Sequence, residues 1–147
     1  MGDEVEQRTF SRQDRQDFRR KVQQCLDALA SMLADDTFAV DEPRIGMEIE
    51  LNLVDDAMDP AMANTAVLEA IADPDFQTEL GRFNIEINVA PAPLAGDRMR
   101  TLETELRASL DHADARAKET GSALAMIGML PTLREEHFAA RWLSENP

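Results

Sequence analysis

Two short segments of this sequence, residues 44–54 and 83–89, alternate between apolar and polar side chains. Side chains of a β-strand point alternately to its two faces, so this pattern predicts two strands, each with one apolar and one polar face. The apolar positions are Ile45, Met47, Ile49, Leu51 and Leu53 in the first segment and Phe83, Ile85, Ile87 and Val89 in the second. The polar positions are Gly46, Glu48, Glu50 and Asn52 in the first segment and Asn84, Glu86 and Asn88 in the second. The fold must therefore bury one face of each strand and leave acidic groups on the other.

Three carboxylates on these polar faces, Glu48, Glu50 and Glu86, allow two interpretations. Residues two apart on a strand lie roughly 6.5–7 Å apart and point the same way. If the second strand lies nearby, the three carboxylates repel one another unless a cation sits among them, and Mg²⁺ prefers such oxygen ligands. The alternative is a solvated sheet surface, because antiparallel sheets commonly expose one polar face. Glu and Asn are poor strand formers, which weakens this alternative without removing it.

Gly46 lies inside the first strand pattern. A glycine within a strand costs stability and commonly marks the close approach of a ligand or of another backbone. We therefore expect one of two structures at Gly46: a ligand beside it, or a β-bulge or tight packing. The pattern favours neither.

The balance of charge limits the partners of the chain. Its 147 residues include 29 acidic and 15 basic ones, for a net charge of −14. Nucleic acids and anionic membranes need a basic surface, so neither is an expected partner, whereas cations and cation-bridged ligands are. No segment approaches the ~20 apolar residues of a membrane span, and residues 1–20 lack the apolar core of a signal peptide. Cys25 is the only cysteine and cannot form an internal disulfide, so we expect a cytoplasmic protein.

Helical periodicity surrounds the two strands, which we place at 44–54 and about 82–90. The other expected elements are a helix over 11–34 opened by a capping box of Ser11 and Asp14, a short helix from Asn64 or Thr65 to Ile71, a helix from Asp97 to Gly121, a strand over 122–129 and a helix within 132–147. The order α-β-α-β-α-β predicts an α+β fold in a single domain over 1–147, with helices packed on one face of the sheet. Residues 1–9 are expected to be a disordered lead. A β-α-β order taken alone favours a parallel crossover connection.

Other chemically active residue types are weaker candidates. His112 falls on the polar side of its predicted helix, which indicates a solvated histidine. His137 follows Glu135 and Glu136, where a solvated charge cluster is favoured over a metal site. Cys25 falls in an apolar helical stripe and is predicted to be a core residue. The sequence has no glycine-rich phosphate-binding loop, and we assign no catalytic residue from it.

Several motifs in order give the chain a family resemblance. Residues 46–55, GMEIELNLVD, and residues 85–91, IEINVAP, resemble the acidic strand motifs of the glutamate–cysteine ligase family, in the branch that includes bacterial carboxylate–amine ligases. The helix over 102–117 and the strand end GMLP at 128–131 continue the resemblance, which covers about residues 40–147. It implies part of a glutamine-synthetase-like catalytic domain, in which a mainly antiparallel, or mixed, sheet forms the active-site floor.

The resemblance implies an ATP-dependent carboxylate–amine ligase of glutathione biosynthesis. In such enzymes a carboxylate, typically the γ-carboxylate of glutamate, attacks the γ-phosphate of ATP, and an amine, typically that of cysteine, then attacks the acyl phosphate to form an amide. Mg²⁺ or Mn²⁺ neutralises the phosphates. Glu48, Glu50 and Glu86 match the metal-binding positions of the family. Arg44 and Asn88 flank them and are candidates for contacts to the substrate or to the metal ligands.

The resemblance also raises expectations about the state of the chain. Members of this family are much longer, so we expect an N-terminal segment of a ligase, or a naturally short relative, that is inactive alone. An incomplete sheet has an unpaired edge that invites another chain, so we expect a homo-oligomer. The small-molecule partners would be ATP and small amino acids. The alternative function is a non-catalytic acidic α+β module for binding or oligomerisation.

Overall fold

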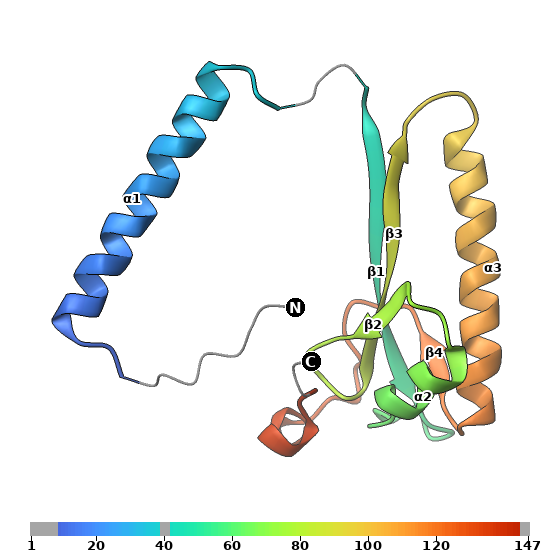
Figure 1. Cartoon of the computed structure of the whole chain (residues 1–147). Coiled ribbons are helices and arrows are strands. Elements are labelled where there is room, and N and C mark those ends of the chain that lie inside the picture. The colour runs from blue at the N-terminus through green and yellow to red at the C-terminus, as the bar shows by residue number, and fades with distance from the viewer. Residues whose placement is uncertain (1–8, 39–41, 145–147) are drawn as a thin grey trace. The chain divides into compact units, whose positions relative to one another are not determined.

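The computed structural model describes residues 9–38 and 42–144 (Figure 1). The chain forms two compact units, which divide between Pro43 and Arg44 and are described separately below. Residues 1–8 lie outside the described residues, so the disordered lead expected there stays a prediction. The expectation of a single domain over residues 1–147 also stays a prediction.

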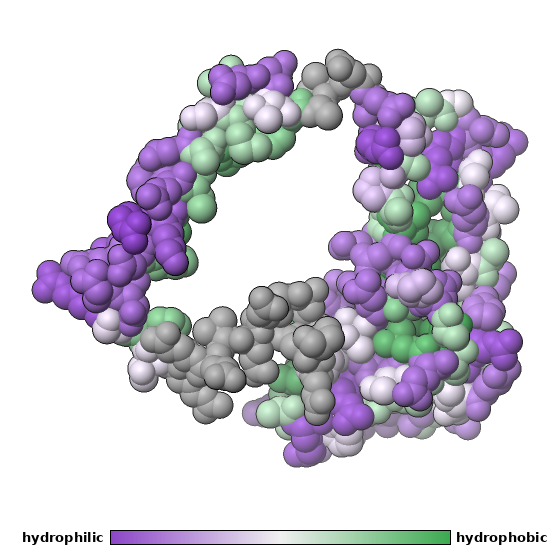
Figure 2. Space-filling view, viewed as in Figure 1, coloured by the Kyte–Doolittle hydropathy of each residue, from purple (hydrophilic) through white to green (hydrophobic). Residues whose placement is uncertain are grey.

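The first unit is built on one helix, α1 (Arg12–Ala34). Its N-terminus forms the predicted capping box: the Asp14 backbone N–H donates to Ser11 Oγ at 3.1 Å, and the Ser11 backbone N–H donates to Asp14 Oδ2 at 2.8 Å. No residue of α1 is buried, and apolar side chains gather along one side of the helix (Figure 2). Cys25 is exposed, so its prediction as a core residue was wrong, because the apolar stripe that carries it is itself exposed.

The second unit holds a four-stranded sheet in the order β2-β3-β1-β4. Its strands are β1 (Arg44–Val54), β2 (Phe76–Thr78), β3 (Asn84–Pro93) and β4 (Ala123–Ala125). All neighbouring strands are antiparallel, which confirms the α+β fold class and shows that no parallel crossover joins β1 to β3. The two long strands, β1 and β3, lie side by side and form the main body of the sheet (Figure 1).

Two helices, α2 (Asn64–Ile71) and α3 (Arg98–Glu119), pack on the apolar face of this sheet. The alternation in β1 and β3 places their apolar side chains toward these helices, because a strand has a period of two. The buried core consists of Leu51, Leu53, Val67, Ile71, Phe76, Ile85, Ile87, Ala113 and Ala117. The acidic positions therefore lie on the face that α2 and α3 do not cover. None of the described helices is long and apolar enough to cross a membrane.

One strand of the sheet was not predicted, and another is shorter than predicted. β2 has only three residues, too few for a visible alternation, and depends on pairing with β3, where Phe76 lies opposite Ile87. β4 covers 123–125 instead of 122–129, because only these residues pair with the end of β1. The chain then leaves the sheet edge, and the Ile127 carbonyl accepts a hydrogen bond from Asn52 Nδ2 at 2.8 Å.

The prediction of a helix within 132–147 was wrong over the described residues. Two short 3₁₀ helices, η1 (Glu135–Phe138) and η2 (Ala140–Trp142), stand there instead. The backbone that follows pairs with the loop before β3: the Arg82 N–H donates to the Trp142 carbonyl, and the Ser144 N–H donates to the Leu80 carbonyl, each at 2.9 Å. These groups are unavailable for helical hydrogen bonds, which explains why the segment does not continue as a helix.

Candidate metal site on the acidic face of the sheet

The register of β1 and β3 brings the predicted acidic residues together. Glu50 lies directly opposite Glu86, and Glu48 lies directly opposite Asn88. On the other side of β3, Gln77 of β2 is also opposite Glu86. Directly opposed residues of an antiparallel pair have Cα atoms about 4.5–5.5 Å apart, so the Glu50 and Glu86 side chains start from neighbouring positions on one face.

This pairing is electrostatically unfavourable for the protein alone. Like charges directly opposite one another destabilise a sheet. No basic side chain within residues 9–38 and 42–144 forms an ion pair with Glu48, Glu50 or Glu86. Asn88 Nδ2 donates to Glu86 Oε1 at 2.9 Å, which orients that carboxylate but leaves its charge in place. The face thus has a net negative charge without a counter-cation from the described chain.

The donor set of the face suits a hard divalent cation. Its carboxylates and the nearby Asn88 amide supply oxygen atoms, and Mg²⁺ prefers oxygen ligands while it retains several waters. Glu48 and Glu50 are exposed and Glu86 is partly buried, so a cation and its waters could reach all three. In the described part of the chain, no three acidic, histidine or cysteine side chains converge as a ready-made cluster. The residues therefore fit Mg²⁺ in chemistry and share a face, while their side chains are not gathered around one point.

Gly46 marks the outer end of this face, where β1 and β3 change register. Ile45 pairs with Ala92 and Met47 with Val89, so β3 has one extra residue opposite Gly46. A Cβ atom at Gly46 would lie 2.9 Å from the Val89 carbonyl oxygen and 3.1 Å from Pro91 Cγ. Of the two structures expected here, the chain forms the β-bulge with close backbone packing. A shallow hollow of about 560 Å³ runs from this bulge to Glu48 and Asn88.

Arg44 lies at the start of β1, beyond the bulge. It pairs with Pro93 across the strands, and its Nη2 donates to the Pro91 carbonyl at 3.0 Å. Glu50 lies six positions further along the strand, roughly 20 Å of extended chain. This places Arg44 at the rim of the face, where it stabilises the bulge, and away from the opposed carboxylates.

The inner end of the polar face is closed by an amide network that the alternation did not reveal. Asn84 Nδ2 donates to Asn52 Oδ1 at 2.8 Å, and Asn52 Nδ2 donates to the Ile127 carbonyl at the same distance. Asn52 is only 4% exposed, although the pattern places it beside Glu50 on the solvated face. One sequence signal could have indicated this burial: the polar face of β1 changes from Glu50 to Asn52. An uncharged amide can be buried at lower cost than a carboxylate.

The two histidines lie outside this face. His112 Nε2 is 3.2 Å from the carbonyl oxygen of Ile71, at the C-terminus of α2, so this exposed histidine links α3 to α2. His137 Nδ1 accepts a hydrogen bond from the Arg134 backbone N–H at 3.0 Å, and its Nε2 lies 4.0 Å from Glu136. Neither histidine joins a metal-ready cluster in the described residues, and the solvated interpretation of His112 holds apart from this one contact.

Comparison with known proteins agrees with the geometry of the sheet. The model of one family, described as glutamate-cysteine ligase family 2, matches residues 44–142. The matched range contains the whole sheet, both helices packed on it and every acidic residue of the candidate site. Searches among curated proteins and among solved structures gave no match. Because the match spans about two thirds of the sequence, and begins where the second unit begins, the chain belongs to glutamate-cysteine ligase family 2.

Proposed function

We propose that this chain supplies the metal-binding floor of an ATP-dependent carboxylate–amine ligase of glutamate–cysteine type. The main support is that Glu50 and Glu86 lie directly opposite each other on two strands within the family match. Neither carboxylate forms an ion pair with a basic side chain among the described residues. A cation bound between these two carboxylates would remove their mutual repulsion, which explains how the sheet tolerates them side by side. The family match supports a ligase, and the charge of the face supports phosphates held through a metal.

In this proposal each residue of the face has a role that its position allows. Glu50 and Glu86 would hold the cation, and Glu48 would supply a further oxygen. Asn88 keeps one Glu86 oxygen oriented through its hydrogen bond of 2.9 Å. Arg44 fixes the bulge at the rim of the hollow. When bound, Mg²⁺ or Mn²⁺ supplies charge neutralisation for the phosphates of ATP.

The proposed reaction has two steps. A carboxylate oxygen of the donor substrate, glutamate in the typical case, attacks the γ-phosphorus of ATP, and ADP leaves with the electrons of the broken P–O bond. The amine nitrogen of the acceptor, cysteine in the typical case, then attacks the acyl carbon, phosphate leaves, and the amine loses a proton. The acidic face contributes by positioning the nucleotide phosphates, and positioning is a main source of catalysis in phosphoryl transfer. We propose that the 147-residue chain alone is inactive and acts within a larger assembly that holds the substrates.

Substoichiometric Mn²⁺ tests the proposed metal site without requiring turnover, because the paramagnetic ion broadens amide resonances near its binding site. We expect selective broadening at residues 46–52 and 84–88, competed by Mg²⁺. Glu50→Gln should reduce this broadening, because it removes one of the two opposed charges. Glu105→Gln on α3 is the matched control, since the Glu105 carboxylate accepts a hydrogen bond from Arg98 on the same helix and lies outside the β1–β3 face, and it should leave the pattern unchanged. Broadening spread evenly over all acidic surfaces would contradict the site.

The same titration separates this proposal from its alternative, an acidic α+β module that only binds partners or oligomerises. The alternative predicts no preference of the ion for the β1–β3 face over other carboxylates. We further propose a cytoplasmic location, with ATP and small amino acids as ligands and a second copy of the chain as a protein partner. The outer edge of β1 over residues 45–51 supports self-association, because among the described residues β4 pairs with only the last three residues of β1, Asn52–Val54.

A further inference from the structure

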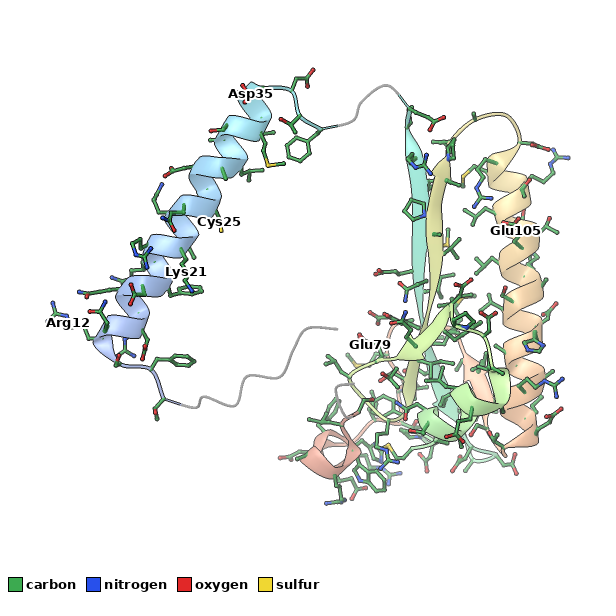
Figure 3. All side chains as sticks on the ribbon, in the orientation of Figure 1. Arg12, Lys21, Cys25, Asp35, Glu79 and Glu105 are labelled. Atoms are coloured by element: carbon green, nitrogen blue, oxygen red, sulfur yellow. The ribbon has the colours of Figure 1, made fainter. Side chains whose placement is uncertain are left out.

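Helix α1 presents a continuous apolar stripe that the proposed ligase chemistry does not use. Six large side chains of this stripe are between 39% and 68% exposed: Phe18, Val22, Leu26, Leu29, Met32 and Leu33. They lie along one side of the helix, together with Cys25 (Figure 2 and Figure 3). An exposed apolar stripe of this length, bordered by charged residues, is typical of a surface that another protein covers.

The spacing of the stripe indicates what kind of surface covers it. Phe18, Val22, Cys25, Leu29 and Met32 follow one another at intervals of four, three, four and three residues. This is the heptad spacing at which two helices pack along a common seam, with each side chain inserted between residues of the facing helix. Similar spacing also lets α3 pack on the sheet of the second unit, so the spacing fits a helical partner and the charges select it.

The distribution of charge along α1 identifies the partner. Residues 12–21 contain five basic and two acidic residues, whereas residues 22–36 contain three acidic residues and no basic one. Two such helices in parallel would place like halves together, whereas an antiparallel pair places each basic half beside an acidic half. The acidic half would also be repelled by an anionic membrane. We propose that α1 pairs in antiparallel orientation with α1 of a second copy of this chain.

One alignment satisfies the seam and the charges together. Cys25 lies opposite Leu29 of the partner subunit, and Val22 lies opposite Met32 of the partner subunit, so four apolar layers form about the two-fold axis. Lys21 and Asp35, both labelled on α1 in Figure 3, would then face each other across the pair twice. Such an interface is isologous, as expected for a closed homodimer. This pairing is independent of the metal site and of the ligase chemistry.

The first test is the oligomeric state of the full chain by sedimentation equilibrium. We expect a dimer for the native sequence and at least about a tenfold rise in the dimer dissociation constant for Leu29→Asp, because a buried charge at the seam has no partner. Leu80→Asp is the matched control, since Leu80 is an exposed leucine outside α1, and it should leave the constant unchanged. A native chain that stays monomeric at ~0.5 mM, or equal effects of the two substitutions, would overturn the proposal.

The second test determines the orientation, and uses the fact that Cys25 is the only cysteine. The native chain is mixed with a Cys25→Ser, Leu29→Cys variant and oxidised gently, and the disulfide-linked products are separated by mass. The antiparallel alignment places Cys25 of the native chain opposite the new cysteine at position 29 of the variant. The mixed dimer should therefore exceed half of the linked product, which is the share expected for random pairing of equal amounts. A parallel pair would instead link Cys25 to Cys25, and predominance of that product would overturn the orientation.

Charge reversal gives an independent check in which the apolar seam stays intact. Lys21→Asp and Asp35→Lys should each weaken the dimer about two- to fivefold at low salt, because each places like charges across the pair. The double variant should recover the native dissociation constant, since the two positions face each other only in an antiparallel dimer. In a parallel dimer these residues are about 21 Å apart along the axis. Failure of the double variant to recover the native constant would therefore reject the proposed alignment.

Discussion

At the scale of single residues, Gly46 shows how a backbone contact can demand one residue type. We expect Gly46→Ala to lower the free energy of unfolding by about 1–3 kcal/mol, the usual cost of forcing extra volume into a packed site. The reason is that the new Cβ atom would lie 2.9 Å from the Val89 carbonyl oxygen, a backbone atom that cannot move alone. Urea unfolding measures the change, and Gly128→Ala is the control, because nothing lies within 4 Å of its added Cβ. Equal losses in the two variants would contradict the role of the bulge.

The Asn52 amide is the residue on which the inner end of the acidic face depends. Asn52→Ala should cost about 1–3 kcal/mol of unfolding free energy, because it leaves the Asn84 amide and the Ile127 carbonyl without their bonds to this side chain. Gln77→Ala, an exposed position on β2, is the control and should change stability by less than about 0.5 kcal/mol. If the two variants unfold at the same urea concentration, the amide network contributes nothing measurable.

At the scale of elements, α1 depends on its capping box more than a core helix would, because no residue of α1 is buried within a single chain. Ser11→Ala removes the acceptor for the Asp14 N–H and should destabilise the helix by about 1 kcal/mol. We expect faster amide hydrogen exchange in the first turns of α1 and unchanged exchange in the sheet. Ser31→Ala, whose hydroxyl donates to the Asp27 carbonyl inside the helix, should not reproduce this effect. Uniform exchange changes along the whole chain would argue against a local cap.

Asp114 couples α3 to β4 and makes part of the stability depend on pH. The hydrogen bond from Lys118 lowers the pKa of Asp114, helped by the Leu124 backbone N–H and opposed by partial burial. A lowered pKa in the folded state means that this stabilisation is present above the unfolded pKa of about 3.9 and is lost as the pH falls below it. Asp114→Asn should therefore flatten the fall in unfolding free energy on acidification from pH 5. Asp111→Asn, one turn earlier on the exposed side, serves as the control, and parallel profiles for all three proteins would contradict the coupling.

The elements also show what the sequence can and cannot predict. Alternation predicted β1 to the residue, and it predicted which side chains share the acidic face, because side-chain direction is a local property of a strand. The opposition of Glu50 and Glu86 required the register of two strands far apart in sequence, which periodicity does not contain. β2 and the tail around η1 and η2 were missed for the same reason, since their hydrogen bonds come from distant segments. The bulge at Gly46 could be predicted only in part. The glycine within a strand pattern indicated an irregularity, but the sequence did not show which backbone lies against it.

At the scale of the whole molecule, the net charge of −14 should oppose compact folding through repulsion among carboxylates. We therefore expect the free energy of unfolding at pH 7 to rise when NaCl increases from 20 to 200 mM, because the screening length shortens to less than about 10 Å. Urea is the suitable denaturant, since it is uncharged and does not screen these charges itself. MgCl₂ at equal ionic strength should stabilise the native chain further, through binding at the β1–β3 face. In Glu50→Gln this extra gain should shrink, whereas the NaCl effect should persist. A loss of stability on adding NaCl would show that attractive ion pairs, such as those along α3, outweigh the repulsion.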